Sequence, residues 1–307
     1  MPFRISNLES RISMIVWRIR ERALPLARPM IMGVVNITPD SFSDGGKFFS
    51  GTAAVDHGLE LIDEGADILD IGGESTRPQG ATPVNVDEER RRVLPVVAEL
   101  RQRLPGTVIS VDTVKSDVAE AALREGADVI NDVSAFRLDA RMAGVCASAG
   151  AGVILMHSRG VVSDMGTYAH AHYGDDPVGD VLAELEERIT AAREAGVEES
   201  RIAIDPGIGF AKRSEHSIKI LSELDRLVLR GLPVVVGVSR KRFIGELSGV
   251  TEPAERVDGT VAANIMALVA GARIFRVHDV KANRRALDVA WAIFDQQTTQ
   301  AQNRAGA

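Results

Sequence analysis

Short apolar runs along this 307-residue chain end, one after another, in side chains that carry charge or form hydrogen bonds. The residues at these ends are Asn36, Asp70, Asp112, Asn131, His157, Asp205, Ser239 with Lys241, and Arg276 with His278. One aspartate after a strand is more often a helix N-cap than a ligand contact. A polar ending on nearly every run instead predicts that these side chains meet at one shared site.

The cationic members of this set suit an anionic ligand. Arg276 and His278 lie two residues apart in "RVHD", so they point to the same face of a strand. Arginine binds phosphate oxygens through paired hydrogen bonds, and the stretches "SDGG" and "GGESTRPQG" can add backbone donors. Together with Arg77, Lys241 and Asn36, these residues predict a phosphate or diphosphate site.

The acidic and amide members suit a different ligand group. Asp112, Asn131 and Asp205 end three different runs and are expected to lie deep in the site, away from the anion. Carboxylates beside an amide match a heterocycle with several N–H donors, such as a 2-amino-4-oxo pyrimidine. The alternative is that Asp112 and Asp205 pair with Lys241 and only hold the interior together.

Eight apolar runs must position these residues. They are residues 30–36, 67–73, 108–113, 128–133, 152–157, 202–207, 234–239 and 274–279. Their nearly continuous hydrophobicity is typical of strands that are covered on both faces, as in a parallel sheet. Helical patterns lie between them, such as "SDVAEAALREG", in which Ser116 is the expected N-cap and Gly126 the expected C-terminal stop.

The repeated order of strand and helix predicts a (β/α)8 TIM barrel, whose chemistry lies at the carboxyl ends of the strands. The junctions "DEGADILDI", "REGADVIND" and "VAGARIFRV" repeat one supersecondary unit. A doubly wound open sheet is the alternative, but no GxGxxG follows the first strand. We expect an N-terminal extension over 1–28 containing a hairpin in "MIVWRIRERALPL", the barrel over 29–296, and a disordered tail over 297–307.

Composition narrows the function class. The net charge of −7 argues against nonspecific nucleic-acid binding, and no apolar run reaches the length of a membrane span. The single cysteine, Cys146, excludes an internal disulfide and suits a reducing cytoplasm. The motifs GxSxG, HExxH, GxxxxGKS and CxxC are absent from the sequence.

From Met30 to about Phe294 the sequence resembles bacterial dihydropteroate synthase, of the pterin-binding family. The motifs that carry the resemblance follow in the family's order: "MGVVNITPDSFSDGG", "DILDIGGESTRP", "VISVDT", "VINDVS", "IDPGIGF", "VSRKRFIGE" and "RVHDV". The resemblance implies an enzyme that joins p-aminobenzoate to 7,8-dihydropterin-6-ylmethyl diphosphate, giving 7,8-dihydropteroate and diphosphate for folate synthesis. It also implies a homodimer and magnesium as the cofactor.

The resemblance assigns roles to individual residues. Asp112, Asn131 and Asp205 would hold the pterin ring, and Lys241 would bridge the pterin and the p-aminobenzoate side. Asn36 would sit beside magnesium and diphosphate, which Arg276 and His278 would grip. Thr76, Arg77, Phe210 and Ser239 would shape the p-aminobenzoate slot. The expected catalytic residues are therefore Lys241, Arg276, His278 and Asp112. The resemblance also implies that the diphosphate leaves before the weakly nucleophilic amine attacks.

Two departures from the family pattern affect that slot. Gln79 stands between Pro78 and the usual glycine, and Ile208 stands where some members carry phenylalanine. Both could alter the binding of sulfonamides, which mimic p-aminobenzoate. Two alternatives remain open: a methyltetrahydrofolate-binding domain of a methyltransferase, and a catalytically silent paralogue that keeps only pterin binding.

Overall fold

The computed structural model describes residues 15–37, 51–74 and 84–305, with side chains up to residue 296. An eight-stranded sheet forms its centre, in the order β8-β7-β6-β5-β4-β3-β10-β9. The strands are β3 (Met30–Asn36), β4 (Ile68–Gly72), β5 (Val108–Asp112), β6 (Val129–Asp132), β7 (Gly152–Met156), β8 (Ile202–Asp205), β9 (Val235–Val236) and β10 (Ile274–Val277). Each of these strands lies within one of the eight predicted runs.

All neighbouring strands of this sheet are parallel, and the sheet closes on itself. Ile204 of β8 forms a parallel bridge with Val234, which directly precedes β9. The backbone N–H of Ile204 donates to the Pro233 carbonyl at 2.9 Å. Because the two outer strands meet, the TIM barrel prediction is confirmed and the open doubly wound sheet is excluded.

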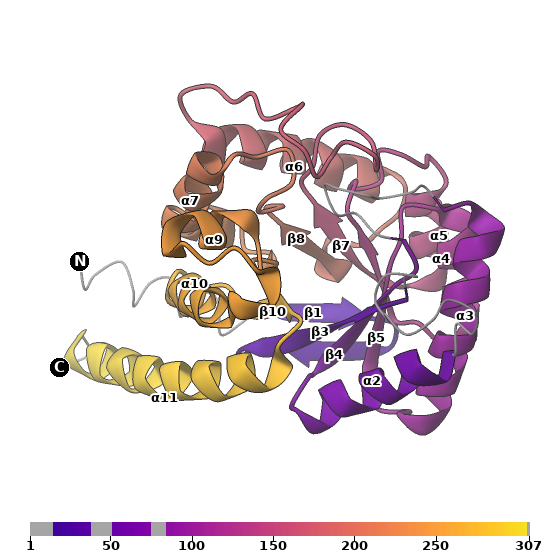
Figure 1. Ribbon diagram of the computed structural model, residues 1–307, viewed down its shortest axis with the longest axis horizontal. Helices are drawn as coiled ribbons and strands as arrows, with labels where there is room; N and C mark the ends of the chain where they lie inside the picture. Colours follow the sequence, from indigo (N-terminus) through magenta and orange to yellow (C-terminus); the bar gives the residue numbers. More distant parts are fainter. Residues whose placement is uncertain (1–14, 38–50, 75–83, 306–307) are drawn as a thin grey trace.

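The helices lie outside the strands (Figure 1). They are α2 (Gly51–Asp63), α3 (Val86–Arg103), α4 (Ser116–Glu125), α5 (Met142–Ala149), α6 (Pro177–Glu194), α7 (Ser214–Ser222), α8 (Asp225–Val228), α9 (Arg242–Ser248), α10 (Val257–Val269) and α11 (Val280–Ala305), with short 3₁₀ turns η2 (Glu199–Arg201) and η3 (Pro253–Glu255). Within the described ranges, none of these helices has the length and apolar character that crossing a membrane requires.

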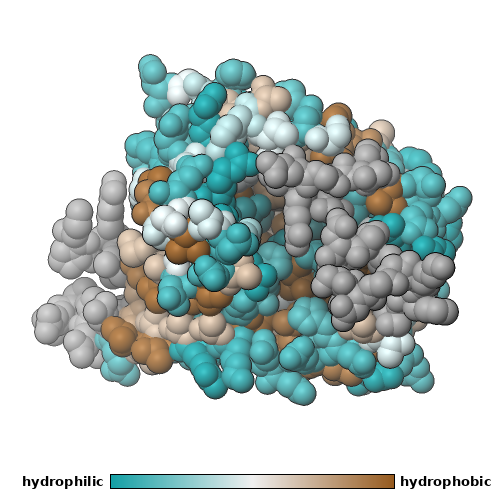
Figure 2. All heavy atoms as spheres, in the orientation of Figure 1, coloured by the Kyte–Doolittle hydropathy of each residue, from teal (hydrophilic) through white to brown (hydrophobic). Residues whose placement is uncertain are grey.

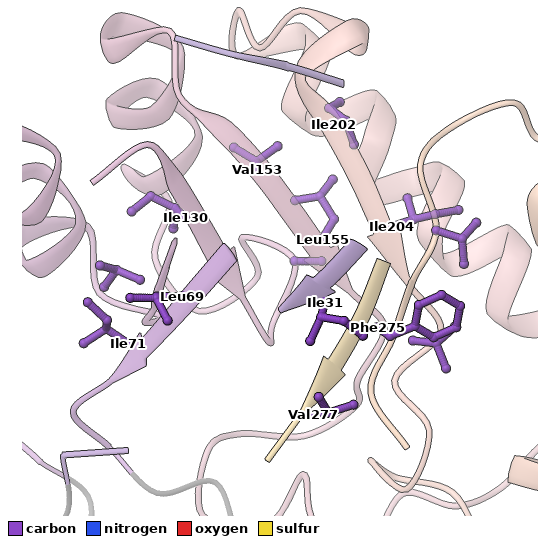
Figure 3. Close-up of a cluster of buried hydrophobic side chains, with 14 of the residues drawn as sticks. Ile31, Leu69, Ile71, Ile130, Val153, Leu155, Ile202, Ile204, Phe275 and Val277 are labelled. Carbon is purple, nitrogen blue, oxygen red and sulfur yellow. The ribbon is translucent and has the colours of Figure 1, made fainter. Parts of the chain in front are cut away.

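The outward faces of the strands form the main core. Leu69 and Ile71 of β4, Val153 and Leu155 of β7, and Phe275 of β10 belong to one buried cluster with the surrounding helices (Figure 3). These positions alternate with inward-facing ones because successive strand residues point to opposite faces. Both faces are covered, which explains the continuous hydrophobicity of the sequence.

An antiparallel hairpin closes the amino end of the barrel, as the sequence predicted. It consists of β1 (Val16–Ile19) and β2 (Arg22–Pro25). Trp17 and Ile19 are fully buried in a second cluster with the first inward-facing residues of the barrel strands. The indole Nε1 of Trp17 donates to the Arg201 carbonyl at 2.8 Å, and a Cβ on Gly152 would lie only 2.2 Å from Ile19. The barrel therefore has an apolar floor, and its polar groups lie towards the opposite end.

Two local predictions differ from the structure. Ser116 is the first residue of α4 and Lys115 is its N-cap, whereas Gly126 does end the helix, with φ +111°. The N–H of Ser116 instead donates to the Asp139 carboxylate at 2.8 Å, a partner that lies 23 residues away in sequence. At the C-terminus, α11 continues to Ala305 through part of the segment predicted to be disordered. Extending a formed helix needs no new nucleation, and the glutamines and alanines there favour it.

Candidate active site

The interior of the barrel changes from apolar to polar two residues above the floor. Ile68, Val108, Val129, Ala203 and Ile274 are floor residues that pack with the hairpin. Strand residues two apart share a face, so the next inward positions are Asp70, Ser110, Asn131, Asp205 and Arg276. The third level towards the carboxyl ends holds Gly72, Asp112, Val133, Ser239 and His278. The structure therefore brings most of the predicted strand-end groups to the upper half of the barrel interior. His157 is the exception, because it falls on the other face of its strand and its ring contacts Lys212 and Glu184 instead.

Arg276 lies at the centre of this polar level. Its Nε donates to Oδ2 of Asp70 at 2.6 Å, and its Nη2 donates to Oδ2 of Asp112 at 2.9 Å. The Asp70 carboxylate is fully buried and also accepts from Nδ2 of Asn131 at 3.2 Å. One guanidinium from β10 thus binds carboxylates from β4 and β5 through short, charge-assisted hydrogen bonds, and Asn131 of β6 joins the group through Asp70.

This arrangement differs from the two separate half-sites that the sequence predicted. Arg276, assigned to the anion, is bonded directly to Asp112, assigned to the ring. The structure also does not show the alternative pairing with Lys241. Among the described residues, no ion pair joins Lys241 to Asp112 or to Asp205, and Asp112 pairs with Arg276. Sequence alone could not choose among these partners, since each residue comes from a different strand.

Asp205 is the last residue of β8, and Phe210 lies in the loop that follows it. The N–H of Gly207 donates to Oδ1 of Asp205 at 2.6 Å, so the loop folds back over the carboxylate. The ammonium of Lys241 lies 4.0 Å from the centre of the Phe210 ring, a cation–π contact. Asp205, Phe210 and Lys241, which the sequence assigned to adjoining parts of the site, are therefore close together.

Burial shifts the pKa of three of these groups towards neutrality. Desolvation raises the pKa of Asp112 to about 7, opposed by Arg276 and reinforced by the Asp70 charge. Desolvation also raises the pKa of Asp205 to about 6, opposed by the Gly207 N–H and by Lys241. Burial and the nearby Arg276 together lower the pKa of Lys241 to about 8, opposed by Asp205 and Asp112. Such perturbed groups, gathered at one end of the barrel, are typical of functional sites.

His278 and Ser239 form a pair at the rim. The Ser239 hydroxyl accepts from the backbone N–H of His278 at 3.2 Å and lies 3.0 Å from the ring Nδ1. When that hydroxyl donates its own proton to Nδ1, the neutral ring carries its proton on Nε2. Ser239, expected beside p-aminobenzoate, therefore contacts the histidine assigned to diphosphate.

Asn36 lies at the end of β3, and Gly72 separates it from Asp112. A Cβ on Gly72 would lie 3.7 Å from Oδ1 of Asn36 and 3.7 Å from Cβ of Asp112, so the missing side chain leaves room there. The amide oxygen facing that room is the kind of ligand that magnesium takes. Across the parts of the chain that the structure describes, no three His, Cys, Asp or Glu side chains gather as a metal cluster.

Thr76, Arg77 and Gln79, which the sequence placed at the p-aminobenzoate slot, lie outside the described residues. Asp70 was predicted to lie at the shared site but was given no role there. Its position on the inward face, two residues before Gly72, is the signal for its contact with Arg276. Lys212, which is 1% exposed below the β8–α7 loop, was missed because nothing in the sequence distinguishes it from a surface lysine.

The chain belongs to the pterin binding enzyme family, whose sequence profile matches residues 32–278. Among curated relatives, dihydropteroate synthase of Bacillus subtilis is 44% identical over 254 residues, 83% of this chain and 85% of that protein. The structure of Xanthomonas albilineans dihydropteroate synthase with 4-aminobenzoic acid superposes with a TM-score of 0.83 at 47% identity, covering 91% of this chain and 98% of the other. Its complex with 7,8-dihydropteroate gives a TM-score of 0.81 at 45% identity and the same coverage.

Proposed function

We propose that the barrel mouth joins p-aminobenzoate to 7,8-dihydropterin-6-ylmethyl diphosphate and releases 7,8-dihydropteroate and diphosphate. The protein is an enzyme, a transferase of the dihydropteroate synthase class, as its family, its relatives and its fold agree. The observation on this chain that carries the proposal is the hydrogen-bonded group of Asp70, Asp112, Asn131 and Arg276 inside the barrel.

The pterin ring would bind at the level of this buried group. Asp112, Asn131 and Asp205 offer carboxylate and amide oxygens to the ring and amino N–H groups. N–H donors stabilise the ionised form of a carboxylate, so the ligand would lower the raised pKa of Asp112 as it binds. Arg276 would line this level, because both of its bonds hold it beside Asp112 and Asp70.

The diphosphate would extend from the ring level towards the rim. His278 is two residues beyond Arg276 on the strand, which places it roughly 6–7 Å nearer to the opening. The bond between the exocyclic methylene and the diphosphate oxygen would break first, and its electron pair would leave with the diphosphate. The positive charges of Arg276 and Lys241 and an N–H donor of His278 would stabilise that charge, while Asp112 and Asp205 would favour the cation left on the pterin.

The amine of p-aminobenzoate would then form the new C–N bond and lose a proton to solvent or to the departing diphosphate. The slot for this substrate would lie beside Lys241 and Phe210, whose ring already covers the ammonium at 4.0 Å. Ser239, Thr76 and Arg77 complete the proposed slot.

We include magnesium in the proposal, held by Oδ1 of Asn36 and by oxygens of the diphosphate. One protein ligand suffices because magnesium usually takes its remaining ligands from phosphates and water. When bound, it supplies positive charge to the leaving group. The room beside Gly72 and the oxygen donor of Asn36 support this position.

We also propose that the protein is a cytoplasmic homodimer. Large apolar side chains are exposed on α9, α10 and α11, namely Leu247, Met266, Val289 and Ile293, at 58% to 70% exposure. Figure 2 shows apolar side chains gathered over α10 and α11. Exposed apolar patches of this kind mark protein interfaces. Light scattering of the native protein and of Met266→Glu would test the dimer, because a charge there should favour the monomer.

Formation of 7,8-dihydropteroate by the purified protein, with magnesium and both substrates, tests the function directly. Product should appear together with diphosphate. Asp112→Asn should bind the pterin substrate more weakly, because a donor replaces an acceptor. Pterin binding without any product would instead indicate a silent paralogue, and unchanged binding by Asp112→Asn would contradict the proposed ring site.

A further inference from the structure

Lys212 lies below the active-site loop and takes no part in the chemistry proposed above. Although it stands directly before the polar stretch "RSEHS", its side chain is 1% exposed and is among the largest fully buried side chains described. Its ammonium reaches back under its own loop and across to the end of β7. A buried lysine without a carboxylate in contact is rare enough to need an explanation.

The surroundings of this ammonium match its three N–H donors. Nδ1 of His157 lies at 2.7 Å, the Phe210 carbonyl at 3.0 Å and the Gly207 carbonyl at 3.1 Å, with the His157 carbonyl at 3.5 Å. Burial and the Lys212 charge lower the pKa of His157 to about 4, so its neutral ring accepts at Nδ1. Nε2 of His157 then donates to Glu184 at 3.1 Å.

The loop around this ammonium is conformationally demanding. Gly207, Gly209 and Ala211 have φ values of +65°, +79° and +47°, in the left-handed region. A Cβ on Gly207 would lie 1.8 Å from the His157 carbonyl, so the loop backbone approaches β7 very closely. Backbone of this kind persists only where surrounding contacts hold it.

The loop after β8 contacts or carries two residues of the site, Asp205 before it and Phe210 within it. Gly207 donates to Asp205, and Phe210 places its ring over the Lys241 ammonium. Asp205 is also held by its strand, whereas Phe210 lies five residues beyond and depends on the loop itself. The two carbonyls that Lys212 holds, those of Gly207 and Phe210, span the part of the loop that carries the ring.

We propose that Lys212 is a positioning residue for the p-aminobenzoate side of the site, whose buried ammonium fixes the loop that presents Phe210 to Lys241. The inference rests on the proposed function, since it assigns Phe210 and Lys241 to that substrate. Without the ammonium, two buried carbonyls and one ring nitrogen lose their donor, and the loop must rearrange to satisfy them.

The first test compares Lys212→Met with the native enzyme at a single pH. Methionine keeps an unbranched, apolar side chain as far as the position of Cε and removes the terminal amino group with its donors and charge. We expect KM for p-aminobenzoate to rise by about tenfold or more, the scale set by losing a buried hydrogen-bond donor. KM for the pterin diphosphate should change by less than about threefold, because β8 still holds Asp205.

Two further variants separate positioning from a general loss of stability. Lys219→Met, on the exposed face of α7 and bonded to Glu223, should leave both KM values unchanged. In a double-mutant cycle, Lys212→Met should add little to the KM effect of Phe210→Ala, because both act through the same ring. If Lys212→Met does not fold, His157→Ala removes one acceptor and should raise the same KM more modestly.

Any of three results would overturn the role of Lys212. These are equal rises in the KM values for both substrates, no change in either KM, or full additivity of Lys212→Met with Phe210→Ala. Failure of the proposed function looks different, because the native enzyme would then form no dihydropteroate.

Discussion

Replacing Asp70 by asparagine tests the central feature of the site. Asp70→Asn keeps the shape of the side chain and removes its negative charge. The native carboxylate is fully buried, accepts from Nε of Arg276 at 2.6 Å and accepts from Nδ2 of Asn131 at 3.2 Å. Asp112 remains as the second partner of Arg276, at 2.9 Å, so the guanidinium is not left unpaired.

The expected loss follows from these contacts. A hydrogen bond to a charged group contributes about 1.5–3 kcal/mol, and complete removal of one partner of a buried ion pair costs about 3–5 kcal/mol. Because Asp112 still neutralises Arg276, we expect the lower range, a fall of about 1.5–3 kcal/mol in the free energy of unfolding. Arg276 and Asn131 both lose an anchor at the ring level, so pterin binding should weaken by about tenfold.

Urea unfolding and calorimetric titration with the pterin diphosphate measure the two effects. Glu186→Gln is the matched control, because it makes the same chemical change in a pair with Arg230 that is partly exposed. An exposed pair contributes about 0–1 kcal/mol, so this control should unfold and bind nearly as the native protein does. If Asp70→Asn behaved like Glu186→Gln in both measurements, the view of Asp70 as the anchor of Arg276 would be refuted.

Three other perturbations probe the floor, the loop and the titrating groups. Trp17→Ala should lower the free energy of unfolding by about 3–5 kcal/mol. The ligand affinity of the folded variant should stay unchanged. A large loss of affinity would mean that the floor and the mouth of the barrel are coupled. Gly207→Ala should lower the urea midpoint and raise KM for p-aminobenzoate, because its Cβ would meet the His157 carbonyl at 1.8 Å. The control is Gly144→Ala in α5, where a Cβ meets nothing within 4 Å; it should stabilise the protein by about 0.5–1 kcal/mol. Pterin binding should weaken by up to about tenfold per pH unit below pH 7. The reason is that Asp112, with its pKa of about 7, must be ionised to accept N–H bonds and becomes protonated as the pH falls. The binding of pterin by Asp112→Asn should depend less on pH.

The repetition of one strand–helix unit was enough to predict the fold. Eight apolar runs matched the eight strands, and the hairpin at the N-terminus was also visible as an alternating pattern. Helix boundaries were less predictable where the partner was distant, as at Ser116, whose N–H is bonded to Asp139. The end of α11 was missed because polarity does not distinguish a solvated helix from a disordered tail.

The sequence by itself determined most of the chemical groups that gather at the mouth, because they end strands whose carboxyl ends meet in a closed barrel; His157 is the exception. It therefore identified Asp112, Asn131, Asp205, Lys241 and His278 as neighbours. Only the tertiary structure decided which of them touch, because strand stagger sets the relative height of residues on different strands. That is why Arg276 bonds to Asp70 and Asp112, and why Lys212, with no pattern to reveal it, is buried beneath the loop that carries Phe210.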